Sequence, residues 1–143
     1  MLNEVTRALI IPFLFLFIFC GCKQRDPVKE IKLKGLTIQL RTLPDAAGDG
    51  SASYAARLIP DKALLKEKGG DIKSALMYRM DSCFYMRSGG KTVYAALVQP
   101  VANGLTGIFE YLVTFDKNEA GRPNSTLIYQ DKYLNKETYS FTP

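Results

Sequence analysis

The sequence predicts a mainly β protein, a small antiparallel β-sandwich of about seven strands with at most one short helix, behind an N-terminal signal segment. Apolar and polar residues alternate in several short segments, and glycine-containing turns separate these segments at regular intervals. The chain has 143 residues, which suits one domain after removal of a leader. We divide it into a signal peptide at 1–21, a short tether at 22–29 and a sandwich at 30–143.

The first segment has the features of an export signal. Residues 8–19 form an apolar run of 12 residues that follows the single base Arg7. A helix that crosses the hydrocarbon core of a bilayer needs about 20 residues. The run is therefore too short for an ordinary transmembrane helix and suits the apolar region of a signal peptide.

The end of this run resembles the lipobox of bacterial lipoproteins, in which a small residue precedes a cysteine. Cys22 fits because Gly21 precedes it, whereas Cys20 follows the bulky Phe19. The resemblance implies that Cys22 carries lipid and anchors the mature protein in a membrane, and two or more acyl chains anchor stably. Lys23, where some lineages place an aspartate for inner-membrane retention, favours the outer membrane facing the periplasm. A plain secretory signal is the alternative.

The first half of the predicted domain contains two strands and a short helix. Residues 30–43 alternate strictly, and the alternation changes phase at Gly35, so we expect one half-buried strand with a bulge. Residues 53–60 predict a second strand with Tyr54 on its apolar side. Residues 61–68 predict one or two helical turns, with Asp61 as N-cap.

The second half predicts strands alone. We expect a long strand at 72–87, in which Asp81-Ser82 marks a bulge. Residues 92–101 are apolar on both faces, which is typical of a central strand. Asn103-Gly104 predicts a hairpin that leads into a strand at 106–115. The last strands are expected at 125–133 and 138–141.

Composition excludes several classes of chemistry. The chain has no histidine, so it lacks the commonest general base and metal ligand. No cysteine cluster suits zinc, and no glycine-rich phosphate-binding motif occurs, so we predict neither catalysis nor a cofactor. The net charge is +5, but the bases are scattered without interleaved aromatic residues, which argues against nucleic acid as a partner.

A few single residues have both a functional and a structural interpretation. Glu110 lies in an apolar strand and is either a functional acid or, as we favour, a rim residue or one paired with Arg79 or Lys91. Cys83 has apolar neighbours and is expected to be buried rather than reactive. Acidic residues at 45 and 49 suggest a turn more than a calcium loop. The eight tyrosines are interpreted as ordinary strand residues, with an interface stripe as the alternative.

Three segments resemble a family of envelope proteins: VQPVANG at 98–104, FEYLVTFD at 109–116 and DKYLN at 131–135, which follow YRMDSCFY at 78–85. They are similar to small lipoproteins of the type VI secretion apparatus, the TssQ-like group, and the overall plan of lipidated cysteine, tether and sandwich is similar to TssJ-like lipoproteins. The resemblance implies a non-catalytic part that anchors an envelope-spanning complex to a membrane through Cys22. It assigns no other functional residue.

Three functions remain open at this point. The first is an assembly lipoprotein that binds an envelope protein through a sheet edge or loop. The second is a periplasmic or surface module that binds a glycan or another ligand. The third, which the missing histidine and acid motifs disfavour, is a hydrolase with two carboxylates.

Overall fold

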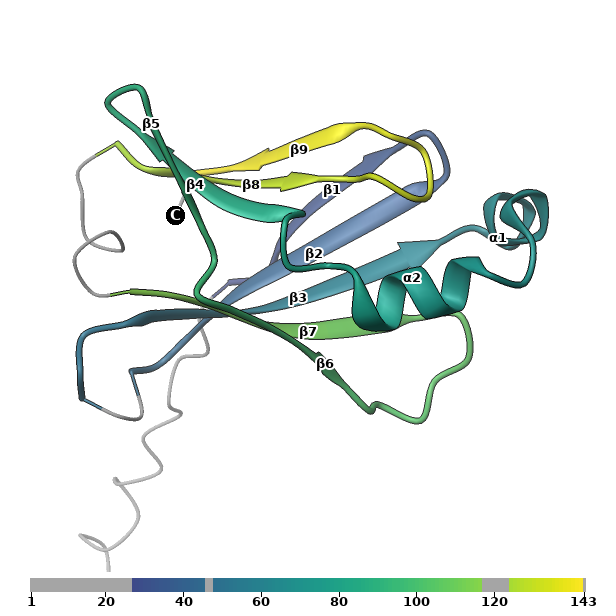
Figure 1. Cartoon of the computed structure of the whole chain (residues 1–143), viewed down its shortest axis with the longest axis horizontal. Coiled ribbons are helices and arrows are strands. Elements are labelled where there is room, and N and C mark those ends of the chain that lie inside the picture. The colour runs from purple at the N-terminus through teal and green to yellow at the C-terminus, as the bar shows by residue number, and fades with distance from the viewer. Residues whose placement is uncertain (1–26, 46–47, 117–123, 143) are drawn as a thin grey trace, which may run out of the picture.

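The computed structural model describes residues 27–45, 48–116 and 124–142, and these form two antiparallel sheets (Figure 1). The five-stranded sheet has the order β1-β2-β3-β7-β6 and the four-stranded sheet the order β5-β4-β8-β9. The predicted class, a small mainly β sandwich, is confirmed. The strands of the first sheet are β1 (Lys29–Leu33), β2 (Leu36–Leu43), β3 (Ala52–Pro60), β7 (Phe109–Phe115) and β6 (Leu97–Val101). Those of the second are β5 (Lys91–Tyr94), β4 (Phe84–Ser88), β8 (Thr126–Gln130) and β9 (Thr138–Phe141).

Residues 30–43 form a hairpin, so the predicted single strand with a bulge is wrong. β1 and β2 pair with Leu33 opposite Leu36, which leaves Lys34 and Gly35 as a two-residue turn. Both turn residues have positive φ, 46° and 77°. This is the geometry of a type I′ turn, whose twist matches that of the flanking strands. The phase change at Gly35 therefore marks a reversal of the chain.

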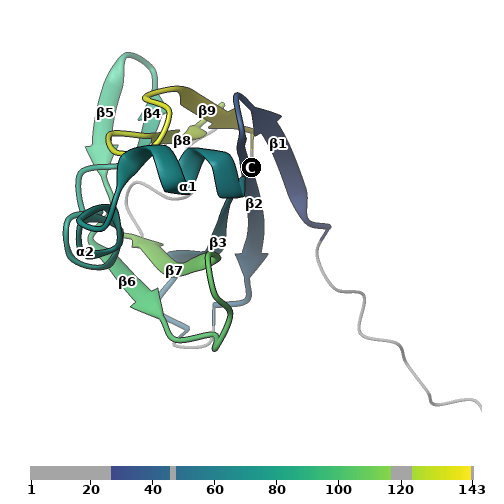
Figure 2. The same ribbon diagram turned by 90° about the vertical axis from the view of Figure 1, so that its right-hand side faces the viewer.

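Two short helices follow β3, one more than predicted. α1 (Lys62–Lys68) confirms the expected helical turns. α2 (Ile72–Tyr78) occupies the first half of the segment for which we predicted a strand, and a turn that includes Asp81 and Ser82 replaces the predicted bulge. Only β4 remains of that strand. Figure 2 views the sandwich from the end at which both helices lie.

Residues 92–101 also differ from the prediction of one central strand. They contain β5 and β6, which are edge strands of different sheets. The chain changes sheet at Ala95 and Ala96, whose backbone N–H groups donate to Phe84 O (3.1 Å) and Thr114 O (2.8 Å). This dipeptide connects the two sheets along one side of the sandwich.

The opposite side is joined by side chains. The amide of Asn135 donates to Leu33 O at 2.9 Å, and the Tyr139 hydroxyl donates to the same oxygen at 3.1 Å. Lys29 Nζ donates to Thr142 O beyond the end of β9. β1, the edge of the first sheet, is therefore tied to the second sheet.

The core lies between the sheets and under α2. The predicted alternation in 53–60 is confirmed, because Tyr54, Ala56 and Leu58 are buried. Five of the eight tyrosines are buried, which argues against an interface stripe: Tyr54, Tyr85, Tyr111, Tyr129 and Tyr139. Within the described residues no helix is long and apolar enough to cross a bilayer.

Candidate functional site

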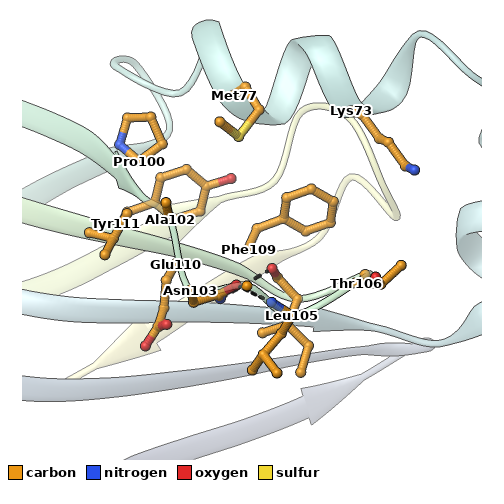
Figure 3. Close-up of a pocket in the computed structure, with 14 residues that line it drawn as sticks. Lys73, Met77, Pro100, Ala102, Asn103, Leu105, Thr106, Phe109, Glu110 and Tyr111 are labelled. Atoms are coloured by element: carbon orange, nitrogen blue, oxygen red, sulfur yellow. Dashed lines mark hydrogen bonds between the residues drawn. The ribbon is translucent and has the colours of Figure 1, made fainter.

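An apolar groove of about 370 Å³ opens beside α2, at the edge of the five-stranded sheet formed by β6. Its walls are α2, the end of β6, the start of β7 and the loop of residues 102–108 that joins these strands. Figure 3 shows the side chains that line it. Those used below are Lys73, Met77, Pro100, Leu105, Phe109 and Tyr111.

Helical periodicity supplies one wall of the groove. Ile72, Ala75 and Leu76 are buried, so this face of α2 packs on the core. Lys73 and Met77 lie four residues apart, one turn along a neighbouring face, and both line the groove. The Leu76 carbonyl accepts a hydrogen bond of 2.7 Å from a buried tyrosine of β7, which holds α2 against the sheet.

The 102–108 loop supplies the opposite wall. Asn103 accepts a hydrogen bond from Leu105 N at 2.9 Å and donates to Ile108 O at 3.4 Å, which closes the loop on itself (Figure 3). Gly107 has φ of +78°, and a Cβ at this position would lie 3.4 Å from a methyl group of Leu65 in α1. Glycine therefore allows close contact with α1. The predicted hairpin at Asn103-Gly104 is confirmed, with seven residues between the strands rather than two.

Large apolar side chains are exposed at the margin of the groove. Leu105 is 52% exposed, Val101 48% and Met77 40%, and all three are among the residues that line it. Tyr78 and Leu97, on the same helix and the same strand, are exposed as well. Isolated exposed apolar residues need no explanation, but several around one concavity are typical of a surface that contacts a partner.

Most polar groups near the groove are already engaged. The Tyr111 hydroxyl donates to Leu76 O, and the Asn103 side chain is used within its own loop. Burial raises the pKa of Tyr111 well above its usual range. Lys73, by contrast, is exposed, and the described residues offer it neither an ion pair nor a hydrogen bond. The groove thus combines an apolar lining with one available positive charge.

Glu110 pairs with Arg57, so the alternative in which it pairs with Arg79 or Lys91 is wrong. The two residues face each other in the register of β3 and β7, and Arg57 Nη2 lies 2.7 Å from Glu110 Oε1. Burial raises the pKa of Glu110, but hydrogen bonds from Arg57 and Asn103 outweigh this effect and hold it below its ordinary value. In Figure 3 the Glu110 carboxylate points away from Phe109 and Tyr111.

The other residues singled out from the sequence are dispersed. Cys22 and the signal segment lie outside the described residues. Cys83 is completely buried, and burial raises its thiol pKa to about 11, which fits the expected core position. Asp45 accepts hydrogen bonds from the N–H groups of Gly48 and Gly50, as a turn residue does. Among the described residues no group of three histidine, cysteine or acidic side chains suits a metal ion.

Asp131 is a buried acid that the sequence analysis did not single out. Its Oδ2 accepts the backbone N–H groups of Leu134, Asn135 and Lys136 at 2.6–2.9 Å, and its Oδ1 accepts the Tyr129 hydroxyl at 2.8 Å. It shapes the loop between β8 and β9 and is 2% exposed, so we assign it a structural role. The sequence signal that could have indicated this role is an aspartate directly after a strand and before a run of loop residues.

The fold and the groove together define a small two-sheet β protein with an apolar concavity at one sheet edge. Comparison of the chain with protein-family models, with curated proteins and with solved structures gives no match.

Proposed function

We propose that this chain is a non-catalytic, lipid-anchored docking module that serves as an assembly or anchoring part of an envelope-spanning secretion complex of the type VI kind. The observation that carries the proposal is the apolar groove beside β6, at the sheet edge opposite the strand to which the tether leads.

The positions of tether and groove suit a protein that bridges a membrane and a partner. Seven peptide units separate Cys22 from Lys29, the first residue of β1, so the tether reaches at most about 25 Å. β1 and β6 are the two edges of a five-stranded sheet and lie about 19 Å apart, since neighbouring strands are spaced 4.7–4.9 Å. A lipid on Cys22 would attach the domain to the membrane through the β1 edge, and the tether is long enough to leave the groove at the opposite edge accessible to a periplasmic partner.

The groove chemistry favours a protein partner over a glycan. A sugar needs several convergent hydrogen-bonding groups, whereas the Tyr111 hydroxyl and the Asn103 amide are already used within the protein. Exposed aliphatic side chains such as Leu105 and Val101 extend the apolar surface beyond the groove. Apolar centres of this type are found in protein–protein interfaces.

The same features favour binding over hydrolysis. Carboxylate-based hydrolysis requires two acids that face one scissile bond. Among the described residues that line the groove, Glu110 is the only acid. Arg57 holds its carboxylate, and hydrogen bonding that outweighs burial lowers its pKa. A lowered pKa suits a permanent ion pair rather than an acid that donates protons near neutral pH.

The link to secretion is the finer part of the proposal. It rests on the resemblance of residues 78–85, 98–104, 109–116 and 131–135 to type VI-associated lipoproteins. Two of these segments supply Pro100 and Phe109 to the groove. The resembling residues therefore include the sheet side of the surface to which we assign docking.

Site-specific photocrosslinking in the cells that make the protein tests the proposal. A photoreactive residue replaces Leu105 at the groove or, as a matched control, the exposed Ser140 on β9, and mass spectrometry identifies adducts in the envelope fraction. We expect a protein adduct from position 105, none from 140, and loss of the adduct in Cys22→Ser.

The result also separates the two parts of the proposal. Adducts with subunits of a secretion apparatus would support both parts. Adducts with a different envelope protein would remove the secretion link and keep the docking module. A position 105 that yields no protein adduct would contradict the docking function itself.

A further inference from the structure

We infer that the groove binds an acidic protein segment, with an aliphatic or aromatic side chain between α2 and the 102–108 loop and a carboxylate of the same segment on Lys73. This inference deepens the proposed function and rests on it. The contacts that support it are the apolar lining, the position of Lys73 and the proline in the edge strand β6.

The lining selects an apolar side chain. Pro100, Phe109 and the ring of Tyr111 come from the sheet, and Met77 faces them from α2 (Figure 3). Met77 has a flexible, polarisable side chain that adapts to different apolar partners. The volume of about 370 Å³ lies at the low end of ligand pockets, so the groove suits inserted side chains rather than a large folded surface.

Lys73 selects a negative charge beside that side chain. It lies one helical turn from Met77, and Figure 3 shows its ammonium group directed away from the apolar lining toward the groove margin. The first turn of α2 contains no acid, and residues 102–108 carry no charge. Asp71, the acid closest in sequence, pairs with Arg79 at 3.6 Å. A carboxylate from a partner therefore meets an ammonium group that no described acid of this chain neutralises.

The edge strand argues against binding by strand addition. Pro100 is the fourth of the five residues of β6, and proline in an edge strand directs its ring nitrogen away from the sheet. A partner strand placed alongside β6 would find no backbone donor at Pro100, which is one way in which proteins block edge pairing. Recognition through side chains in the groove remains available.

The test compares charge variants in the crosslinking assay, with the photoreactive residue at position 105 of the full chain in cells. Lys73→Glu reverses the charge at the groove, Lys73→Arg preserves it, and Lys91→Glu reverses an exposed charge in β5 as the matched control. We expect Lys73→Glu to lower the yield of the protein adduct about fivefold, as an exposed charge pair allows. Lys73→Arg and Lys91→Glu should retain the yield.

Sequencing of the adduct gives an independent readout. We expect an aspartate or glutamate within about three residues of the attachment point, since three residues span about 10 Å. An adduct peptide without such an acid, or a yield insensitive to Lys73→Glu, would overturn the inference and leave the docking function in place. A lipid adduct at position 105 would assign the groove to a lipid and overturn it as well. Absence of any adduct would remove the proposed function too.

Discussion

Replacement of Asp131 tests how the loop between β8 and β9 is held. The carboxylate accepts four short hydrogen bonds, and bonds to a charged group contribute about 1.5–3 kcal/mol each. In Asp131→Ala the N–H groups of Asn135 and Lys136 regain water, because these residues are partly or fully exposed. Tyr129 and Leu134 have no exposed surface, so their donors lose their partner. The loss of these two hydrogen bonds, which water does not replace, predicts destabilisation by about 3 kcal/mol.

Asp131→Asn separates the charge from the hydrogen-bonding geometry. An amide oxygen in place of Oδ2 still accepts the three backbone N–H groups, and the amide nitrogen donates to the Tyr129 hydroxyl. The remaining losses are the long 3.4 Å hydrogen bond from Tyr133 N, which an amide nitrogen cannot accept, and the difference between a charged and a neutral acceptor. We expect a destabilisation of about 1.5 kcal/mol. Asp81→Ala, at an exposed acid, should change stability by less than about 0.5 kcal/mol.

Urea unfolding of the mature chain with Cys22→Ser measures these differences. The midpoint should fall in the order Asp81→Ala, Asp131→Asn, Asp131→Ala, with an unchanged slope in denaturant, because the surface exposed on unfolding is the same. Equal destabilisation by Asp131→Ala and Asp131→Asn would refute the role that we assign to the hydrogen-bonding geometry of the side chain at this position. A loss of unfolding free energy below about 1 kcal/mol in Asp131→Ala would refute the stabilising role of the hydrogen bonds to Asp131.

Three further predictions concern single residues. In the Cys22→Ser background Cys83 should resist a thiol reagent at pH 8 and react fully in urea, because its pKa is about 11; rapid labelling of the native protein would contradict its burial. Gly35→Ala, at φ of +77°, should lower the free energy of unfolding by about 1–2 kcal/mol, whereas Gly70→Ala, in open space, should not; equal effects would argue against the turn geometry. Because the pKa of Glu110 is lower in the folded protein than its ordinary value of 4.5, ionised Glu110 stabilises the fold above pH 4.5. This contribution is lost as pH falls through the folded pKa, so Glu110→Gln should flatten the acid side of a stability–pH profile. An unchanged profile would contradict the Arg57 pair.

The sequence predicted strands well where side-chain periodicity admits one interpretation. In 53–60 Tyr54, Ala56 and Leu58 recur at every second position with Ser53 and Arg57 on the other face, and β3 follows. In and just after α2, the apolar residues Ile72, Leu76, Tyr78 and Met80 are all even-numbered, which satisfies a strand period as well as parts of a helical one. The discriminating position is Ala75, and its small side chain gives a weak signal. The helix was therefore missed.

The crossing between sheets was missed for a related reason. Ala95 and Ala96 separate β5 from β6 without glycine, proline or a polar residue, so the two strands appear as one apolar run. The groove depends on this crossing and on α2, because they bring Lys73 and Met77 beside Pro100. Periodicity alone contains no information about such a long-range contact. Only the hairpin at Asn103-Gly104, which is encoded locally, was predictable at the site.

The ties between β1 and the second sheet have a mechanical consequence. If Cys22 is anchored in a membrane and a partner occupies the groove, as we propose, tension would enter the fold at Lys29 and leave it beside β6, across the hydrogen bonds of the five-stranded sheet. A ladder pulled in this direction opens one pair at a time, and β1 is held to β2 by only five pairs. The bonds from Asn135, Tyr139 and Lys29 anchor this strand to the second sheet as well. They oppose peeling at the strand where a pulled tether would begin to unfold the protein.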